Sequence, residues 1–136
     1  MNRKVLLAYQ LITSFSDTCT GILLIVVPGL TLTLMGVTAP AGWLVYIAYI
    51  GAFVLGVGLC CFYGVRLILR GDHGRQLGTV WLLTAVMRAS VAVFVAQQVA
   101  VGMLSTGWTA VAVFDGACVL VQALGLQKKW TRYAAL

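Results

Sequence analysis

Residues 77–101 read LGTVWLLTAVMRASVAVFVAQQVAV, an apolar stretch that carries a single charge, on Arg88. A helix needs roughly 20 mostly apolar residues to cross the ~30 Å hydrocarbon core of a bilayer. This stretch is long enough, and similar ones occupy about residues 5–27, 43–69 and 108–126. The sequence therefore predicts an all-α fold, a polytopic four-transmembrane-helix bundle that forms a single membrane domain over residues 1–136.

The composition of the whole chain agrees with a membrane protein. Of the 136 residues, 62% are hydrophobic and 9% are charged, and no glutamate occurs. Such a chain cannot cover a water-soluble surface with polar side chains. The formal net charge is +6, but the basic residues flank the apolar segments instead of forming one basic face. We therefore expect the lipid bilayer as a partner and no binding of nucleic acid.

The positions of the basic residues predict the orientation of the chain. Eight of the nine lie before the first segment, on either side of the turn that joins the second and third, or after the fourth: Arg3, Lys4, Arg66, Arg70, Arg75, Lys128, Lys129 and Arg132. The loops at residues 28–42 and 102–107 carry no charge. Because short cytoplasmic loops are enriched in Lys and Arg, we expect both termini in the cytoplasm.

The first of these uncharged loops contains a segment of undecided structure. Pro28 and Gly29 end the first predicted helix, because neither residue continues a helix comfortably. Residues 30–37 after them are either a kinked extension of that helix or a short element at the membrane interface.

Three charged residues lie deep inside the predicted spans, far from their ends: Asp17, Arg88 and Asp115. A charge that faces lipid costs ~2.5–3.5 kcal/mol on insertion scales, so these side chains should face the bundle interior and find partners. With a rise of ~1.5 Å per residue, Asp17 and Arg88 lie at the same depth, roughly 17 Å from the cytoplasmic ends of their helices. Both side chains also lean toward the N-terminus of their own helix, and thus the same way. We predict that Asp17 and Arg88 form an ion pair.

Asp115 belongs to a helix that begins on the opposite side of the membrane. Its side chain should therefore lean outward, away from Arg88. We expect it near the hydroxyl groups of Tyr46 and Tyr49, and in the absence of a nearby cation desolvation favours its neutral form. Asp115 is thus predicted to be largely independent of the other two charges.

Further polar residues recur at helical spacing around these charges. The candidate pocket residues are Gln10, Thr13, Tyr46, Tyr49, Thr84 and Gln122. They are either polar contacts that fix the order of the helices, or a pocket for a quinone, a lipid headgroup or a small solute. A proton path is less favoured, because His73, the only histidine, lies in the predicted turn between the second and third segments.

Small residues occur at every fourth position of the second segment: Ala48, Ala52, Gly56, Cys60 and Gly64. We call this set the small-residue stripe. Small residues at this spacing allow another helix backbone to approach closely. The stripe packs either within the bundle or against another subunit, and the sequence leaves both possibilities open.

A pattern of short motifs covers most of the chain: Pro28-Gly29 after the first segment, Tyr49-Ile50-Gly51-Ala52-Phe53, Gly56-Val57-Gly58-Leu59, Trp81 with Thr84-Ala85 and Arg88, Phe114-Asp115, and Gln122 through Gly125-Leu126. This pattern resembles the small four-helix bacterial membrane proteins known as DoxX-like. The resemblance implies the four-helix topology and, as in some relatives, association with quinone-linked redox enzymes. With a bacterial family as the model, we expect the chain in a bacterial inner (cytoplasmic) membrane.

No pair of His, Cys or Glu residues has the spacing of metal ligands, and no nucleophile, phosphate-loop or dinucleotide motif occurs. We therefore expect no enzymatic activity, no metal and no cofactor. The leading hypothesis is a non-catalytic accessory subunit of a larger membrane complex of respiratory or photosynthetic energy conversion, in contact with other membrane subunits or with itself. The alternatives are a homo-oligomer that binds or transports a small molecule through the polar pocket, and a quinone-site subunit of an oxidoreductase.

Overall fold

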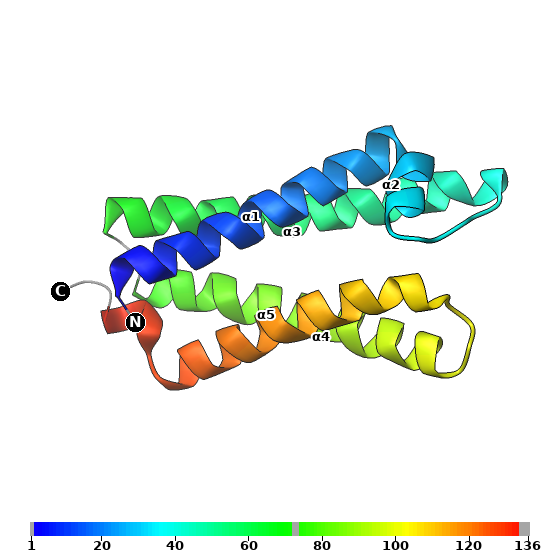
Figure 1. Cartoon of the computed structure of the whole chain (residues 1–136). Helices are drawn as coiled ribbons and strands as arrows, with labels where there is room; N and C mark the ends of the chain where they lie inside the picture. Colours follow the sequence, from blue (N-terminus) through cyan, green and yellow to red (C-terminus); the bar gives the residue numbers. More distant parts are fainter. Residues whose placement is uncertain (1, 72–73, 134–136) are drawn as a thin grey trace.

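A computed structural model describes residues 2–71 and 74–133, and this part of the chain is helical, without strands. The α-helices are α1 (Arg3–Val26), α2 (Pro28–Leu34), α3 (Leu44–Arg70), α4 (Arg75–Ala100), α5 (Thr109–Gln127) and α6 (Trp130–Tyr133), as Figure 1 shows. Two single 3-10 turns, Ala41–Trp43 and Thr106–Trp108, precede α3 and α5. The predicted all-α class is confirmed. His73 and the side chain of Arg132 lie outside the described residues.

Four helical segments are long and apolar enough to cross a membrane: Arg3–Val26, Ala41–Arg70, Arg75–Ala100 and Thr106–Gln127. The helices α1, α3, α4 and α5 begin and end within two residues of the predicted spans. The short α6 was not predicted.

The undecided segment after the first span is a separate short helix. The backbone leaves the helical conformation at Val27 (φ −136°), and Pro28 occupies the first position of α2, where its missing N–H costs nothing. The Thr31 hydroxyl donates a hydrogen bond to the carbonyl oxygen of Val27 at 3.0 Å. Gly36 then takes a positive φ of 72° and turns the chain toward α3.

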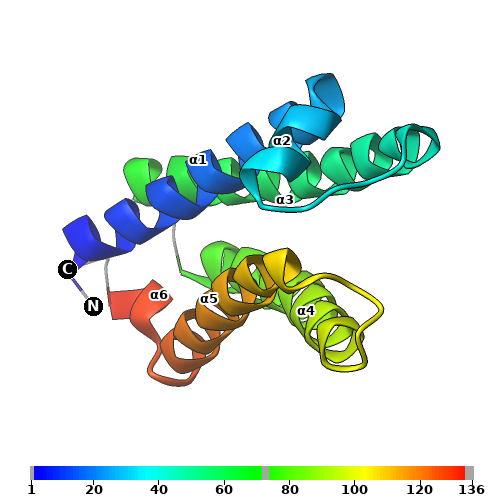
Figure 2. The ribbon, with the colours of Figure 1, turned by 45° about the vertical axis from the view of Figure 1, so that its right-hand side comes forward.

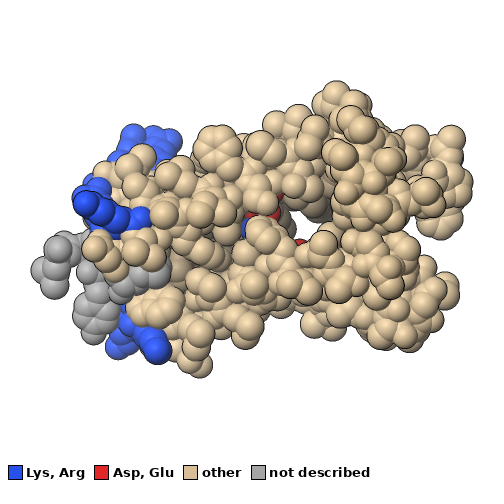
Figure 3. Space-filling view, viewed as in Figure 1, with Lys and Arg blue, Asp and Glu red and all other residues tan. Residues whose placement is uncertain are grey.

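The long helices form two hairpins, α1 with α3 and α4 with α5, and Figures 1 and 2 show the separation between them. The beginnings of α1 and α4 lie at the same end of the molecule as the ends of α3 and α5. The described Lys and Arg side chains other than Arg88 gather at this end, which we call the basic end (Figure 3).

The hairpins touch each other near both ends. At the basic end, a buried cluster draws on three of the long helices: Leu6, Leu67, Ile68, Leu77 and Trp81. At the opposite end, Trp108 before α5 packs on a cluster from the first hairpin: Leu24, Leu32, Val37 and Ile47. Between these contacts, Figure 3 shows a hollow in the molecular surface in which charged atoms are visible; we call it the lateral hollow.

Three glycines bring the backbones of α1 and α3 into contact. A Cβ atom at Gly21 would lie 2.5 Å from the backbone nitrogen of Leu55, and one at Gly58 would lie 2.7 Å from the backbone nitrogen of Thr18. A Cβ at Gly51 would lie 2.9 Å from the carbonyl oxygen of Gly21. Because these spaces are shorter than ordinary van der Waals contacts, only glycine fits there.

The small-residue stripe mostly faces another way. Ala52 and Cys60 are exposed, Ala48 is half-buried, and a Cβ atom at Gly56 would meet nothing within 4 Å. Of the five residues, only Gly64 is buried, against the Gln10 side chain. Of the two possibilities that the sequence left open, packing of the whole stripe within the bundle does not occur. The residues that pack are Gly51 and Gly58, two helical turns apart on a neighbouring face of α3.

The two faces of α3 lead to a paired prediction. Replacing Gly58 with Leu should destabilise the isolated chain by roughly 1–3 kcal/mol, because the new side chain must separate two touching backbones. Gly56→Leu introduces the same side chain into open space and should leave the isolated chain almost as stable as the wild type. Thermal unfolding in mild detergent measures both changes, and equal losses for the two variants would contradict this assignment of faces.

Candidate functional site

Arg88 is buried in the middle of α4 and binds two carboxylates from different helices. Its Nη2 donates to Oδ2 of Asp17 in α1. Its Nη1 donates to Oδ1 of Asp115 in α5 at 2.5 Å. The Arg88 side chain is 3% exposed and those of Asp17 and Asp115 are 8% and 14% exposed. This charge cluster joins the two hairpins at the middle of the spans.

The contact between Asp17 and Arg88 is the one that the depth argument predicted. The predicted independence of Asp115 is wrong. Its helix does begin at the opposite end, but the long Arg88 side chain ends in a planar fork whose two Nη groups point to different sides. One donor reaches Asp17 and the other reaches Asp115, so the outward lean of a short carboxylate side chain does not separate it from Arg88. The Phe114 ring, with its centroid 5.5 Å from the guanidinium carbon, lies against the same group.

Tyr46 and Tyr49 are not part of this site. Each is 65% exposed, on the outer surface of α3, and the Tyr49 ring packs edge-on against Phe53 with centroids 4.9 Å apart. The prediction that their hydroxyls bind Asp115 is therefore wrong. The rotation of α3 that puts Gly51 and Gly58 against α1 turns both tyrosines outward.

A hydrogen-bonded link between three helices lies closer to the basic end than the charge cluster. The buried Gln10 donates through Nε2 to the carbonyl oxygen of Cys61 at 2.9 Å. Its Oε1 accepts a hydrogen bond from the indole nitrogen of Trp81 at 2.8 Å. Trp81 is fully buried and was missed as a site residue, because its place near a helix start is also typical of interfacial tryptophans.

A second link joins α4 and α5. The buried Gln122 donates through Nε2 to Thr84 Oγ1 at 3.0 Å, and Thr84 donates to the carbonyl oxygen of Val80 at 2.8 Å. Thr13 is buried as well, but its hydroxyl bonds to carbonyl oxygens of its own helix. The predicted pocket residues Gln10, Thr13, Thr84 and Gln122 are thus buried, and in both glutamine links they bind protein groups.

The site still has unused hydrogen-bonding capacity. Arg88 Nε, Thr18 Oγ1 and Gln122 Oε1 are buried and have no hydrogen-bond partner within the described residues. With both carboxylates ionised, the cluster carries one more negative than positive charge. The red atoms visible in the lateral hollow of Figure 3 belong to Asp17 or Asp115, the two acidic residues that the structure describes. The arrangement can therefore accept a proton or a hydrogen-bond donor from the hollow.

No family model, curated protein or solved structure matches the chain.

The charge cluster predicts an order of effects in mutants. Arg88→Gln leaves two carboxylates side by side without a cation and should cost roughly 3–5 kcal/mol of stability. Asp17→Asn or Asp115→Asn each leaves a balanced pair and should cost much less. Adding both Asn substitutions to Arg88→Gln should restore most of the loss. Unfolding in detergent at pH 8 measures these differences.

Double-mutant cycles test the geometry further. Arg88 should couple to Asp17 and to Asp115 by well over ~0.5 kcal/mol in each case, since both carboxylates contact the guanidinium. A negligible coupling of Asp115 with Arg88 would show that only one of the two contacts exists in the protein.

Proposed function

We propose that this chain is a non-catalytic accessory subunit of a larger membrane complex, of the kind that serves respiratory or photosynthetic energy conversion. The observation that carries the proposal is the outward-facing part of the small-residue stripe, where Ala52, Gly56 and Cys60 leave the α3 backbone uncovered. In a bilayer, helices associate through close backbone contact at small residues. A helix from another subunit is the expected occupant of this face.

The distribution of polar groups supports the same function. The two glutamine links and the charge cluster bond helices of this chain to one another. Such contacts stabilise a scaffold without engaging a substrate. The connections between the spans are also short, so that most of the described chain lies in the four long helices. A protein of this form acts chiefly through the surfaces of its membrane helices.

The proposal includes the orientation and the membrane. The basic end is assigned to the cytoplasm and the uncharged end to the opposite side, following the enrichment of Lys and Arg in short cytoplasmic loops. A bacterial inner membrane and a relationship to DoxX-like proteins are part of the same proposal, supported by the sequence motifs already given.

Reporter fusions test the orientation. A reporter placed after residue 136 should respond as a cytoplasmic protein, and one inserted within residues 102–107 should respond as a protein on the other side. The physical reason is the concentration of basic residues at one end. The same response from both fusions would contradict the proposed topology.

Purification from native membranes tests the accessory role. In mild detergent the chain should copurify with foreign membrane subunits at a fixed stoichiometry, measured by native mass spectrometry. Gly56→Leu should release these subunits while the chain itself stays folded. The matched control is Ala96→Leu, which enlarges an exposed side chain on α4 and should keep the complex intact. A pure homo-oligomer in the wild type would overturn the accessory-subunit proposal.

The lateral hollow favours a second candidate function, the binding of a small molecule at the charge cluster. A quinone or another lipid-soluble molecule with a polar group is able to reach such a site from the bilayer. This candidate predicts a bound molecule in the purified chain that is lost in Asp115→Asn. A wild-type protein without a bound small molecule would contradict it.

A further inference from the structure

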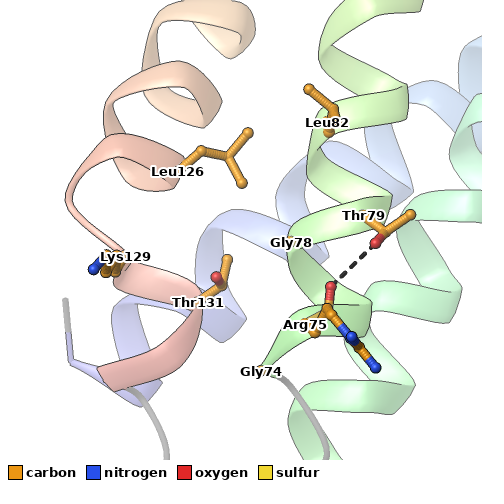
Figure 4. A pocket seen from close by; sticks show the side chains of 8 residues that line it. All are labelled: Gly74, Arg75, Gly78, Thr79, Leu82, Leu126, Lys129 and Thr131. Atoms are coloured by element: carbon orange, nitrogen blue, oxygen red, sulfur yellow. Dashed lines mark hydrogen bonds between the residues drawn. The ribbon is translucent and has the colours of Figure 1, made fainter.

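A cavity at the basic end is not explained by the accessory role. Its volume is about 430 Å³, and it lies between the beginning of α4 and the junction of α5 with α6 (Figure 4). Arg75, Gly78 and Leu82 line it from α4, and Leu126, Lys129 and Thr131 line it from the other side. None of the described residues that line it is acidic.

The lining changes from apolar to polar along the helix axis. Leu82 and Leu126 lie deeper in the helix hairpin, whereas Arg75 and Lys129 lie at the basic end (Figure 4). In a membrane protein this end stands at the level of the lipid headgroups. The gradient matches a phospholipid, whose acyl chains begin just beneath a charged headgroup.

Positive charge flanks the cavity on both sides. Arg75 and Lys129 are exposed, and in Figure 4 their charged ends lie on the outer sides of the two walls. Their long, flexible side chains are able to turn over the opening while their methylene groups stay on apolar surface. The first turn of α4 adds to this field, because it contains no acidic residue and its N-cap, Gly74, has no side chain that could accept hydrogen bonds from the first N–H groups. The N–H groups of an uncapped first turn favour an anion.

Thr131 supplies an independent sign of a ligand. The residue is only 4% exposed and lines the cavity, and its hydroxyl has no hydrogen-bond partner among the described residues. Figure 4 shows this hydroxyl in the space between the helices. Gly78 lies opposite, where an added Cβ atom would be 3.7 Å from Thr131 Oγ1. The hydroxyl group can donate a hydrogen bond to an oxygen atom of an anion bound in the cavity.

We propose that this cavity binds the phosphate group of an anionic phospholipid from the leaflet at the basic end. The phosphate oxygens accept hydrogen bonds from Thr131 and from the first turn of α4. Arg75 and Lys129 close over the phosphate, and the acyl chains leave along Leu82 and Leu126. The backbone at Lys129 has a positive φ of 54°, which turns the chain so that α6 places Thr131 over the cavity.

Native mass spectrometry in an uncharged detergent tests the proposal, with phosphatidylglycerol, phosphatidylcholine and inorganic phosphate as separate probes. We expect phosphatidylglycerol to bind best. The double variant Arg75→Gln/Lys129→Gln should weaken it roughly 30-fold, from about 1 kcal/mol for each basic residue. The control Arg66→Gln/Arg70→Gln removes the same charge at the same end, next to a smaller cavity, and should cause a far smaller loss.

Two variants test the cavity without changing its charge. Thr131→Val removes the hydroxyl group and should weaken phosphatidylglycerol binding roughly 5-fold. Gly78→Leu places a side chain in the cavity and should abolish binding, provided that thermal unfolding shows a folded chain. The site would be overturned if Arg75→Gln/Lys129→Gln and Arg66→Gln/Arg70→Gln weakened phosphatidylglycerol binding equally and Thr131→Val had no effect. Such a result would mean that the lipid binds through general surface charge. Inorganic phosphate binding as tightly as phosphatidylglycerol would overturn the assignment to a lipid.

Discussion

The structure depends on one constraint, that a guanidinium group held among hydrocarbon chains must be neutralised by the protein. Arg88 meets it by binding Asp17 and Asp115 from two other helices. Since lipid tails are as apolar as leucine side chains, burial of apolar surface does little to bring membrane helices together. The charge cluster therefore relates the two hairpins at the middle of the spans.

Within the first hairpin, a different force dominates. The backbones of α1 and α3 meet at Gly21, Gly51 and Gly58, and van der Waals contact over this surface replaces the missing hydrophobic drive. This packing also sets the rotation of α3 about its axis. That rotation turns Tyr46, Tyr49 and most of the small-residue stripe outward. One set of glycines thus decides which residues remain available to partners.

The outer surface divides into regions with different physical roles. The open face of α3 leaves backbone uncovered at small residues, whereas the cavity at the basic end is lined by two basic residues and the Thr131 hydroxyl. The lateral hollow gives access to the charge cluster at the middle of the spans. Because a membrane chain is surrounded by lipid and by other helices, these surface features are where its function is expected to reside.

The sequence by itself determined the helical class and the four spans, because the length of an apolar run is fixed by the thickness of a bilayer. It also determined that Asp17, Arg88 and Asp115 face inward, since a charge facing lipid is costly. The depth of each residue along its helix gave the contact between Asp17 and Arg88. Only the tertiary structure decided that Asp115 shares the same arginine, that Gln10 bonds to Trp81, and that most of the small-residue stripe faces outward. These outcomes depend on how each helix is rotated about its axis and on how far a side chain reaches across the space between helices. Helical spacing fixes neither quantity, because it relates residues within one helix and not between helices.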